Sequence, residues 1–142
     1  MDVKLKREII LDNYQNPANR GIPSDSSYKE VNSRNESCVD NITVAAKVVD
    51  GKVEDVRFDG DACAICTSAS SVMTKELKGK SVEDAEVIIE NFERMINELP
   101  YDEDVLGELN IYNEVYKQPS RKKCALLPMG SIKKIIEDSD ED

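Results

Sequence analysis

Apolar positions recur with two different periods along this chain, and each period predicts a different kind of element. In residues 3–15, apolar side chains are spaced for one face of a helix between charged ones, and Asn16-Pro17 is expected to end that helix. Residues 42–49 are rich in β-branched side chains and predict a strand. Asp50-Gly51 separates this strand from a second apolar run at 52–58, and two such runs around Asp-Gly predict a β-hairpin.

A further strand is expected ahead of this hairpin, over about residues 28–32. Within the run at 52–58, the apolar residues Val53, Val56 and Phe58 do not alternate strictly, which predicts a local bulge. We therefore expect a small antiparallel sheet of three strands.

The second half of the chain carries helical spacing. Small and uncharged residues fill Ala62 to Thr74, and a helix there is expected to stop at Lys78-Gly79-Lys80. Ser81 followed by Asp84 resembles a capping box, and the apolar residues after it are spaced for one helical face. The helices expected after the sheet cover residues 63–77, 82–99, 103–117 (as one or two short helices) and 119–136.

This order of elements, one helix, a small antiparallel sheet and then further helices, is typical of an α+β fold. A length of 142 residues fits a single domain, residues 1–142, with the three-stranded sheet packed against about five helices. Residues 137–142 are almost all acidic, and we expect this tail to be disordered.

Charge and composition narrow the range of functions. The formal net charge of −10 argues against a nucleic acid partner. We expect no membrane association, because no run of about 18 apolar residues is present. Residues 1–8 are charged and lack the apolar core of a signal peptide, so we expect a cytoplasmic protein. Without histidine, the chain has no histidine-based catalysis or metal site, and its four cysteines are more typical of metal ligands or reactive thiols than of disulfides.

Three of the cysteines lie in surroundings that favour chemistry. Cys63 follows the hairpin at the start of a helix, where unpaired N–H groups and the helix dipole stabilise a thiolate. Cys38 lies in a polar loop that leads into a strand, and in an extended segment the side chain of Asp40 points to the same side. Cys124 follows the basic residues 121–123 near the start of the last helix.

Three thiolates and one carboxylate suit a tetrahedral zinc site, and they also suit a loosely held iron–sulfur cluster, because aspartate binds soft metals less well than cysteine. The residues alone leave a second interpretation open, in which the cysteines are small buried apolar side chains. This second interpretation applies most strongly to Cys66. Asp40 is equally consistent with a turn residue at the start of a strand, and Lys122-Lys123 with a solvated helix face.

The segments around these residues resemble the U-type iron–sulfur assembly proteins, the IscU/SufU family that includes the N-terminal domain of NifU. The resemblance spans nearly the whole chain. It implies that Cys38, Asp40, Cys63 and Cys124 are metal ligands. The segments that carry it are Leu11–Gly21, Ser37–Asp40, Gly60–Thr74, Lys78–Lys80 and Arg121–Leu127.

Within this family, the chain is most similar to the SufU branch. IscU-type proteins carry a histidine where this chain has Lys123, and they lack the extra segment around residues 97–118. The resemblance to SufU implies a zinc-bound sulfur acceptor that works with a SufS-type cysteine desulfurase and supplies downstream iron–sulfur assembly or acceptor proteins. As for enzyme activity, the resemblance implies at most a zinc-dependent sulfurtransferase that acts with the desulfurase. In that activity, Cys38 is the implied sulfur acceptor and Arg121 an auxiliary residue.

Two other interpretations remain at this point: an IscU-like scaffold that builds an iron–sulfur cluster on the same ligands, and a metal-free interaction domain. Three departures from the family pattern bear on the choice of partner and metal. Val39 replaces the usual glycine between the first cysteine and the aspartate, Pro128-Met129 replaces the usual aromatic residue, and Cys66 is an additional cysteine.

Overall fold

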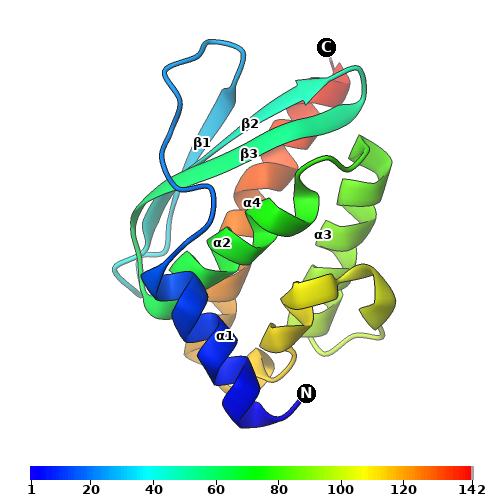
Figure 1. Cartoon of the computed structure of the whole chain (residues 1–142). Coiled ribbons are helices and arrows are strands. Elements are labelled where there is room, and N and C mark those ends of the chain that lie inside the picture. Colours follow the sequence, from blue (N-terminus) through cyan, green and yellow to red (C-terminus); the bar gives the residue numbers. More distant parts are fainter. Residues whose placement is uncertain (142) are drawn as a thin grey trace.

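The structure is a computed structural model that describes residues 1–141, with side chains as far as Asp138. Figure 1 shows the arrangement of its elements. No helix among these residues is both long enough and apolar enough to cross a membrane. The helices are α1 (Val3–Gln15), α2 (Ala64–Leu77), α3 (Val82–Ile96) and α4 (Pro119–Glu141), the strands are β1 (Lys29–Arg34), β2 (Asn41–Val49) and β3 (Lys52–Asp61), and the 3-10 helices are η1 (Glu103–Val105), η2 (Gly107–Tyr112) and η3 (Val115–Lys117).

The strands form one antiparallel sheet in the order β1-β2-β3, which confirms the predicted α+β class. The hairpin turn is Asp50-Gly51, and both residues have positive φ, 51° and 74°, as a type I′ turn requires. The register between β2 and β3 shifts at Lys47 and Val48 and leaves Glu54 without a partner in β2. The predicted bulge is therefore confirmed at Glu54.

Two strands run further than predicted, and both extensions lead toward the cysteines. β1 ends at Arg34 rather than near residue 32, and β3 ends at Asp61 rather than at 58. Asn41, the first residue of β2, pairs with both of these end residues, so the ends of β1 and β3 flank the start of β2. The turn between β1 and β2 is thereby held beside the segment that leads from β3 into α2.

The central helix of the fold is α2. It packs against β3, α1, α4 and η2, while α4 also packs against β1, β2 and α3 (Figure 1). Small side chains allow these close approaches, and buried hydroxyl groups form hydrogen bonds between neighbouring elements. Ser71 Oγ donates to Asn13 Oδ1 at 2.8 Å, and Tyr112 Oη donates to Ser68 Oγ at 2.7 Å. The body of α2 from Cys66 onward is therefore fixed within the core, and its N-terminus lies at the edge of the core.

The predicted start of α3 is confirmed, because Ser81 Oγ accepts a hydrogen bond from the Asp84 N–H at 3.1 Å. Residues 103–117 differ from the prediction, since they form three 3-10 helices instead of one or two helices. Gly107 explains part of this difference. Its φ is +51°, a left-handed conformation that interrupts a regular helix between η1 and η2.

The last helix begins at Pro119 as predicted and continues past Ile136 to Glu141. Asp142 lies outside the described residues, as do the side chains of 139–141. The disorder expected for the acidic tail at 137–142 stays a prediction.

Candidate metal centre

Four side chains from three separate parts of the chain meet at one point. One donor atom from each of Cys38, Asp40, Cys63 and Cys124 lies within 4.8 Å of all the others. Cys38 and Asp40 come from the turn between β1 and β2, Cys63 immediately precedes α2, and Cys124 lies in α4. Among the residues that the structure describes, no other group of cysteines and carboxylates is this compact.

The spacing of these atoms fits a single tetrahedral metal ion. Zinc–thiolate bonds of about 2.3 Å place neighbouring sulfur atoms about 3.8 Å apart, so donors within 4.8 Å need only small shifts to share one ion. A two-iron cluster distributes its ligands over two metal atoms, so it needs ligand atoms that lie further apart. The donor group as it stands is therefore better matched to one ion.

Cys63 is positioned by the start of α2. It is the N-cap of this helix, and its Sγ accepts a hydrogen bond from the Cys66 N–H at 3.5 Å. Its own N–H donates to Asp40 Oδ1 at 2.8 Å. Gly60, three residues earlier, has a φ of +134°, and a Cβ at this position would lie 2.2 Å from the Asn41 carbonyl oxygen. Only glycine allows β3 to pass this close to β2 beside Asp40.

Asn35 organises the turn that carries Cys38 and Asp40. It is buried, and its Nδ2 donates to Asp40 Oδ2 at 3.4 Å and to Cys124 Sγ at 3.5 Å. Its Oδ1 accepts hydrogen bonds from the N–H and the hydroxyl of Ser37, at 3.2 and 2.8 Å. Its backbone N–H donates to the Asp40 carbonyl, and its carbonyl accepts from the Cys38 N–H. One side chain therefore links the turn to α4.

Asn35 was not among the residues predicted from the sequence to form the site. The available signal was Asn35-Glu36-Ser37, in which an asparagine accepts hydrogen bonds from the residue two positions later and forms an Asx-turn. The same turn corrects one expectation. Cys38 and Asp40 do not lie in an extended segment but in a compact turn, and the turn brings their donor atoms together.

The cluster is rich in acidic groups and poor in compensating charge. Burial raises the pKa of Asp40, but hydrogen bonds from Cys124 and from the Cys63 N–H outweigh it and hold that pKa below its ordinary value. Burial also raises the pKa of Cys63, despite the N–H group of the helix start that favours its thiolate. Burial and the nearby Asp40 raise the pKa of Cys124. This differs from the expected stabilisation of the thiolates by the helix N-terminus and the basic neighbours, because desolvation dominates.

A divalent cation at the centre of the group would supply the positive charge that these buried donors lack. Of the three basic residues before Cys124, Arg121 and Lys123 are exposed and Lys122 is half-buried. Metal binding to thiols displaces their protons, so a cation here also offsets the raised thiol pKa values. The donor set therefore fits a soft divalent metal such as zinc.

The remaining residues from the sequence analysis lie around the centre. Cys66 is fully buried in the core, outside the donor group, and burial raises the pKa of its thiol strongly. Arg121 lies one helical turn before Cys124. Val39 is 72% exposed between two of the donors, so it points away from the cluster. Pro128 lies inside α4, where it removes the helical hydrogen bond to the Cys124 carbonyl.

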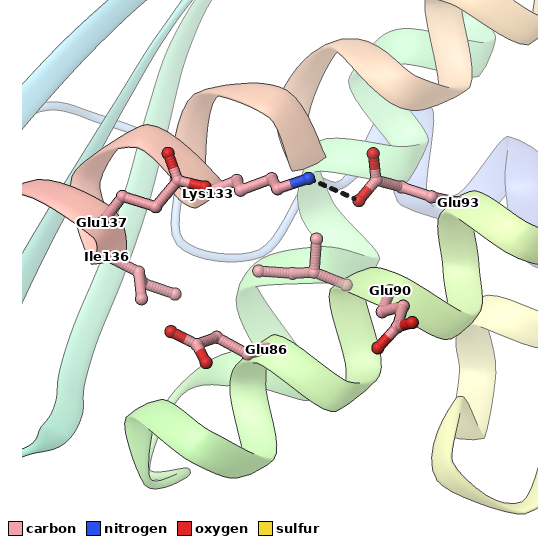
Figure 2. A pocket seen from close by; sticks show the side chains of 7 residues that line it. Glu86, Glu90, Glu93, Lys133, Ile136 and Glu137 are labelled. Atoms are coloured by element: carbon pink, nitrogen blue, oxygen red, sulfur yellow. Dashed lines mark hydrogen bonds and ion pairs between the residues drawn. The ribbon is translucent and has the colours of Figure 1, made fainter.

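A second polar pocket lies between α3 and α4 and is a different kind of site. Its walls are formed by Glu86, Ile89, Glu90, Glu93, Lys133, Ile136 and Glu137. Figure 2 shows the pocket from close by. Lys133 Nζ lies 3.3 Å from Glu93 Oε1, so an ion pair bridges the two helices. The pocket contains no cysteine, and its carboxylates do not form a compact donor group among the described residues.

Comparison with known proteins relates this arrangement to a family. Zinc-dependent sulfurtransferase SufU of Bacillus subtilis is 36% identical over 131 residues, which cover 92% of this chain and 88% of that protein. Iron–sulfur cluster assembly scaffold protein IscU of Thermotoga maritima is 33% identical over 129 residues, which cover 91% and 90%.

Solved structures share the fold. An iron–sulfur cluster assembly scaffold protein for the SUF system from Fervidobacterium islandicum superposes with a TM-score of 0.78 at 30% identity, over 89% of this chain and 92% of that one. A NifU-like N-terminal protein from Brucella abortus gives a TM-score of 0.86 at 21% identity over 99% of both chains, a likeness of fold alone. The family model for the NifU-like N-terminal domain matches residues 5–125. The chain therefore belongs to the family of NifU-like N-terminal domains, as the resemblance of its cysteine motifs predicted.

Proposed function

We propose that this protein acts in iron–sulfur cluster assembly as a zinc-bound sulfur acceptor, which receives sulfur from a cysteine desulfurase. The observation that carries the proposal is the compact group of three cysteines and one aspartate. The similarity over most of the chain to a protein named zinc-dependent sulfurtransferase SufU supports it. The name of the IscU relative from Thermotoga maritima describes the same process, iron–sulfur cluster assembly.

Cys38, Asp40, Cys63 and Cys124 would hold the zinc. Bound zinc would keep the cysteines as thiolates and would protect them until a partner docks. Everything else in the proposed reaction depends on the chain's own residues and on which of the thiols reaches solvent.

Cys38 is the proposed acceptor because it is the donor that moves at least cost. It lies half-buried in a turn whose neighbours, Ser37 and Val39, are exposed. Cys124 is fully buried inside a helix. Cys63 is half-buried as well, but it caps α2 and its N–H holds Asp40, so its displacement would disturb both.

The transfer is a thiol exchange. The Cys38 thiolate attacks the terminal sulfur of the desulfurase persulfide, the sulfur–sulfur bond of that persulfide breaks, and a new sulfur–sulfur bond forms on Cys38. The desulfurase cysteine leaves as a thiolate, so the exchange needs no added oxidant or reductant. Arg121, exposed one turn before Cys124, is proposed to attract the partner or to stabilise the freed thiolate.

The alternative is a scaffold that assembles a cluster on the same four residues, as the names of the IscU relatives describe for those proteins. The narrow spacing of the donors favours the acceptor over the scaffold, because a cluster with two irons requires the turn or α4 to move outward.

The test is the location of the transferred sulfur. The zinc-loaded chain is incubated with a cysteine desulfurase and cysteine without oxygen, and its peptides are then analysed by mass spectrometry. We expect the added mass of one sulfur atom on Cys38, its loss in Cys38→Ser and its persistence in the matched control Cys66→Ser. Sulfur found mainly on Cys63 or Cys66 would contradict the assignment of the acceptor, and no transfer to any cysteine would contradict the function.

A further inference from the structure

A groove beside the metal centre has features of a peptide-binding site. It has a volume of about 500 Å³ and lies between β1 and α4. One wall is formed by four successive residues, 32–35, at the end of β1, and the other by residues of α4. Alternate residues of a strand point to opposite faces, so a groove that touches four in succession is lined by the strand's edge.

β1 is an edge strand, because β2 is its only neighbour in the sheet of the described residues. The Asn35 N–H donates to the Asp40 carbonyl across the β1–β2 pair. In an antiparallel pair, the direction of the backbone groups alternates along the strand. Arg34 and Asn32 therefore point their N–H and C=O groups away from β2, toward the groove. An extended segment can pair with these groups as an added strand.

The wall formed by α4 supplies an apolar surface and positive charge. Lys123, Leu126, Leu127, Gly130 and Lys134 recur at helical spacing on one face of α4, and both leucines are half-buried. A Cβ on Gly130 would meet no atom within 4 Å, so the glycine leaves open space at this point of the groove.

The charge of the groove is opposite to that of the chain. Arg34, Lys123 and Lys134 are the charged residues that line it, and no carboxylate does. None of the three forms a salt bridge with another side chain described by the structure. Charged side chains also protect edge strands from aggregation, but that role does not require a groove with an apolar wall. In a chain with a net charge of −10, a purely cationic groove selects an acidic occupant.

We propose that this groove binds an extended acidic segment of a partner protein, which adds as a strand to the edge of β1 and packs its apolar side chains against α4. The segment would carry acidic and apolar residues in alternation, since the cations and the leucines recur around one strand edge. Binding does not depend on what the metal centre does. The groove lies beside that centre, because Asn35 lines the groove and also contacts Asp40 and Cys124.

The experiment measures fluorescence anisotropy of a labelled peptide of about eight residues that alternates glutamate and valine, titrated with the full chain. We expect saturable binding that weakens with salt, and no binding of an equally labelled lysine–valine peptide. Equal binding of both peptides, or no binding of the acidic one, overturns the proposal.

Two pairs of variants test the geometry. Arg34→Gln removes only a charge and should weaken binding about two- to fivefold. Arg34→Pro also removes the outward N–H without breaking a bond to β2, and should weaken binding at least about fivefold further. Gly130→Leu should abolish binding by filling the groove, whereas Gly130→Ala should preserve most of it. Circular dichroism of each variant verifies folding.

Equal affinities for Arg34→Gln and Arg34→Pro, together with normal binding by Gly130→Leu, would mean unspecific charge attraction and overturn the proposal. Dimers in sedimentation velocity that Arg34→Pro dissociates would assign the edge to a second copy of the chain and also overturn it. Displacement of the peptide by a single-stranded oligonucleotide at equal concentration would do the same.

Discussion

Replacement of Asn35 by alanine tests whether one buried amide holds the metal donors together. Its Nδ2 is shared between Asp40 Oδ2 and Cys124 Sγ at 3.4 and 3.5 Å, and both acceptors are charged when a metal is bound. Groups that orient metal ligands in this way commonly contribute about 10- to 100-fold to metal affinity. The variant should therefore bind zinc more weakly although no ligand is removed.

The magnitude follows from the geometry. The distance to Asp40 Oδ2 exceeds the usual 2.9 Å or so, and sulfur is a weak acceptor, so each hydrogen bond is expected to contribute about 1 kcal/mol, less than a short bond to a charged group. The loss of both then corresponds to roughly a 30-fold weaker zinc affinity, because about 1.4 kcal/mol is a factor of ten. The assay is competition with a chromophoric zinc chelator at fixed pH.

Two control variants separate the shared amide from general disturbance. Asn32→Ala removes an amide from β1, three residues before Asn35, and this amide donates to Asn41, Ile42 and Thr43 and not to the cluster. Ser37→Ala loosens the turn but leaves the Asn35 amide in place. Both should change zinc affinity less than threefold or so. An Asn35→Ala protein with normal zinc affinity, or a Ser37→Ala protein that loses as much, would refute the reasoning.

Three further predictions concern the ligands, the close approach of the strands and a buried carboxylate. Cys124→Ala should lose tight zinc binding, whereas Cys66→Ala should keep it, as equilibrium dialysis can measure; equal losses would contradict the ligand set. Gly60→Ala should lower the free energy of unfolding by more than about 2 kcal/mol, because the added Cβ would collide with the Asn41 carbonyl. Gly79→Ala is the control. A Cβ at Gly79 meets no atom within 4 Å, so this variant should lower the free energy of unfolding by only about 1 kcal/mol. Similar urea midpoints for the two would argue against the close approach. Burial raises the pKa of Asp55, but hydrogen bonds from Tyr28, Arg57 and Lys78 outweigh it and lower that pKa. The stability that the carboxylate contributes is thus present above its unfolded pKa of about 3.9 and is lost as pH falls through the lower folded value. Asp55→Asn should therefore cost about 1–3 kcal/mol at pH 7 and progressively less below pH 4 or so, and a pH-independent cost in urea unfolding would be inconsistent with this.

Local patterns in the sequence predicted most of the fold. The hairpin at Asp50-Gly51, a bulge within residues 52–58 and the cap at Ser81 each depend on neighbouring residues, and all three were predicted; the type I′ turn and the position of the bulge at Glu54 come from the structure. The 3-10 helices at 103–117 were not predicted, because their form depends on long-range contacts such as the hydrogen bond from the Glu108 N–H to Glu76 Oε1 at 3.1 Å.

The candidate site was less accessible to such reasoning. Cysteine spacing alone left open whether Cys38, Cys63 and Cys124 are ligands or core residues, and the resemblance to a family supplied the choice. The contact between the turn and α4 depends on Asn35, whose partners lie 5 and 89 positions away. The raised pKa values of Cys63 and Cys124 were missed because burial, which dominates them, follows from the tertiary packing.

The central claim is that Cys38, Asp40, Cys63 and Cys124 bind one zinc ion. The most direct measurement is the content of zinc, iron and acid-labile sulfide in the chain purified without oxygen, together with its visible spectrum. We expect a colourless protein with one zinc per chain and no sulfide, and a Cys124→Ala variant without zinc. A brown protein that holds iron and sulfide in similar amounts would contradict it and identify the chain as a cluster scaffold.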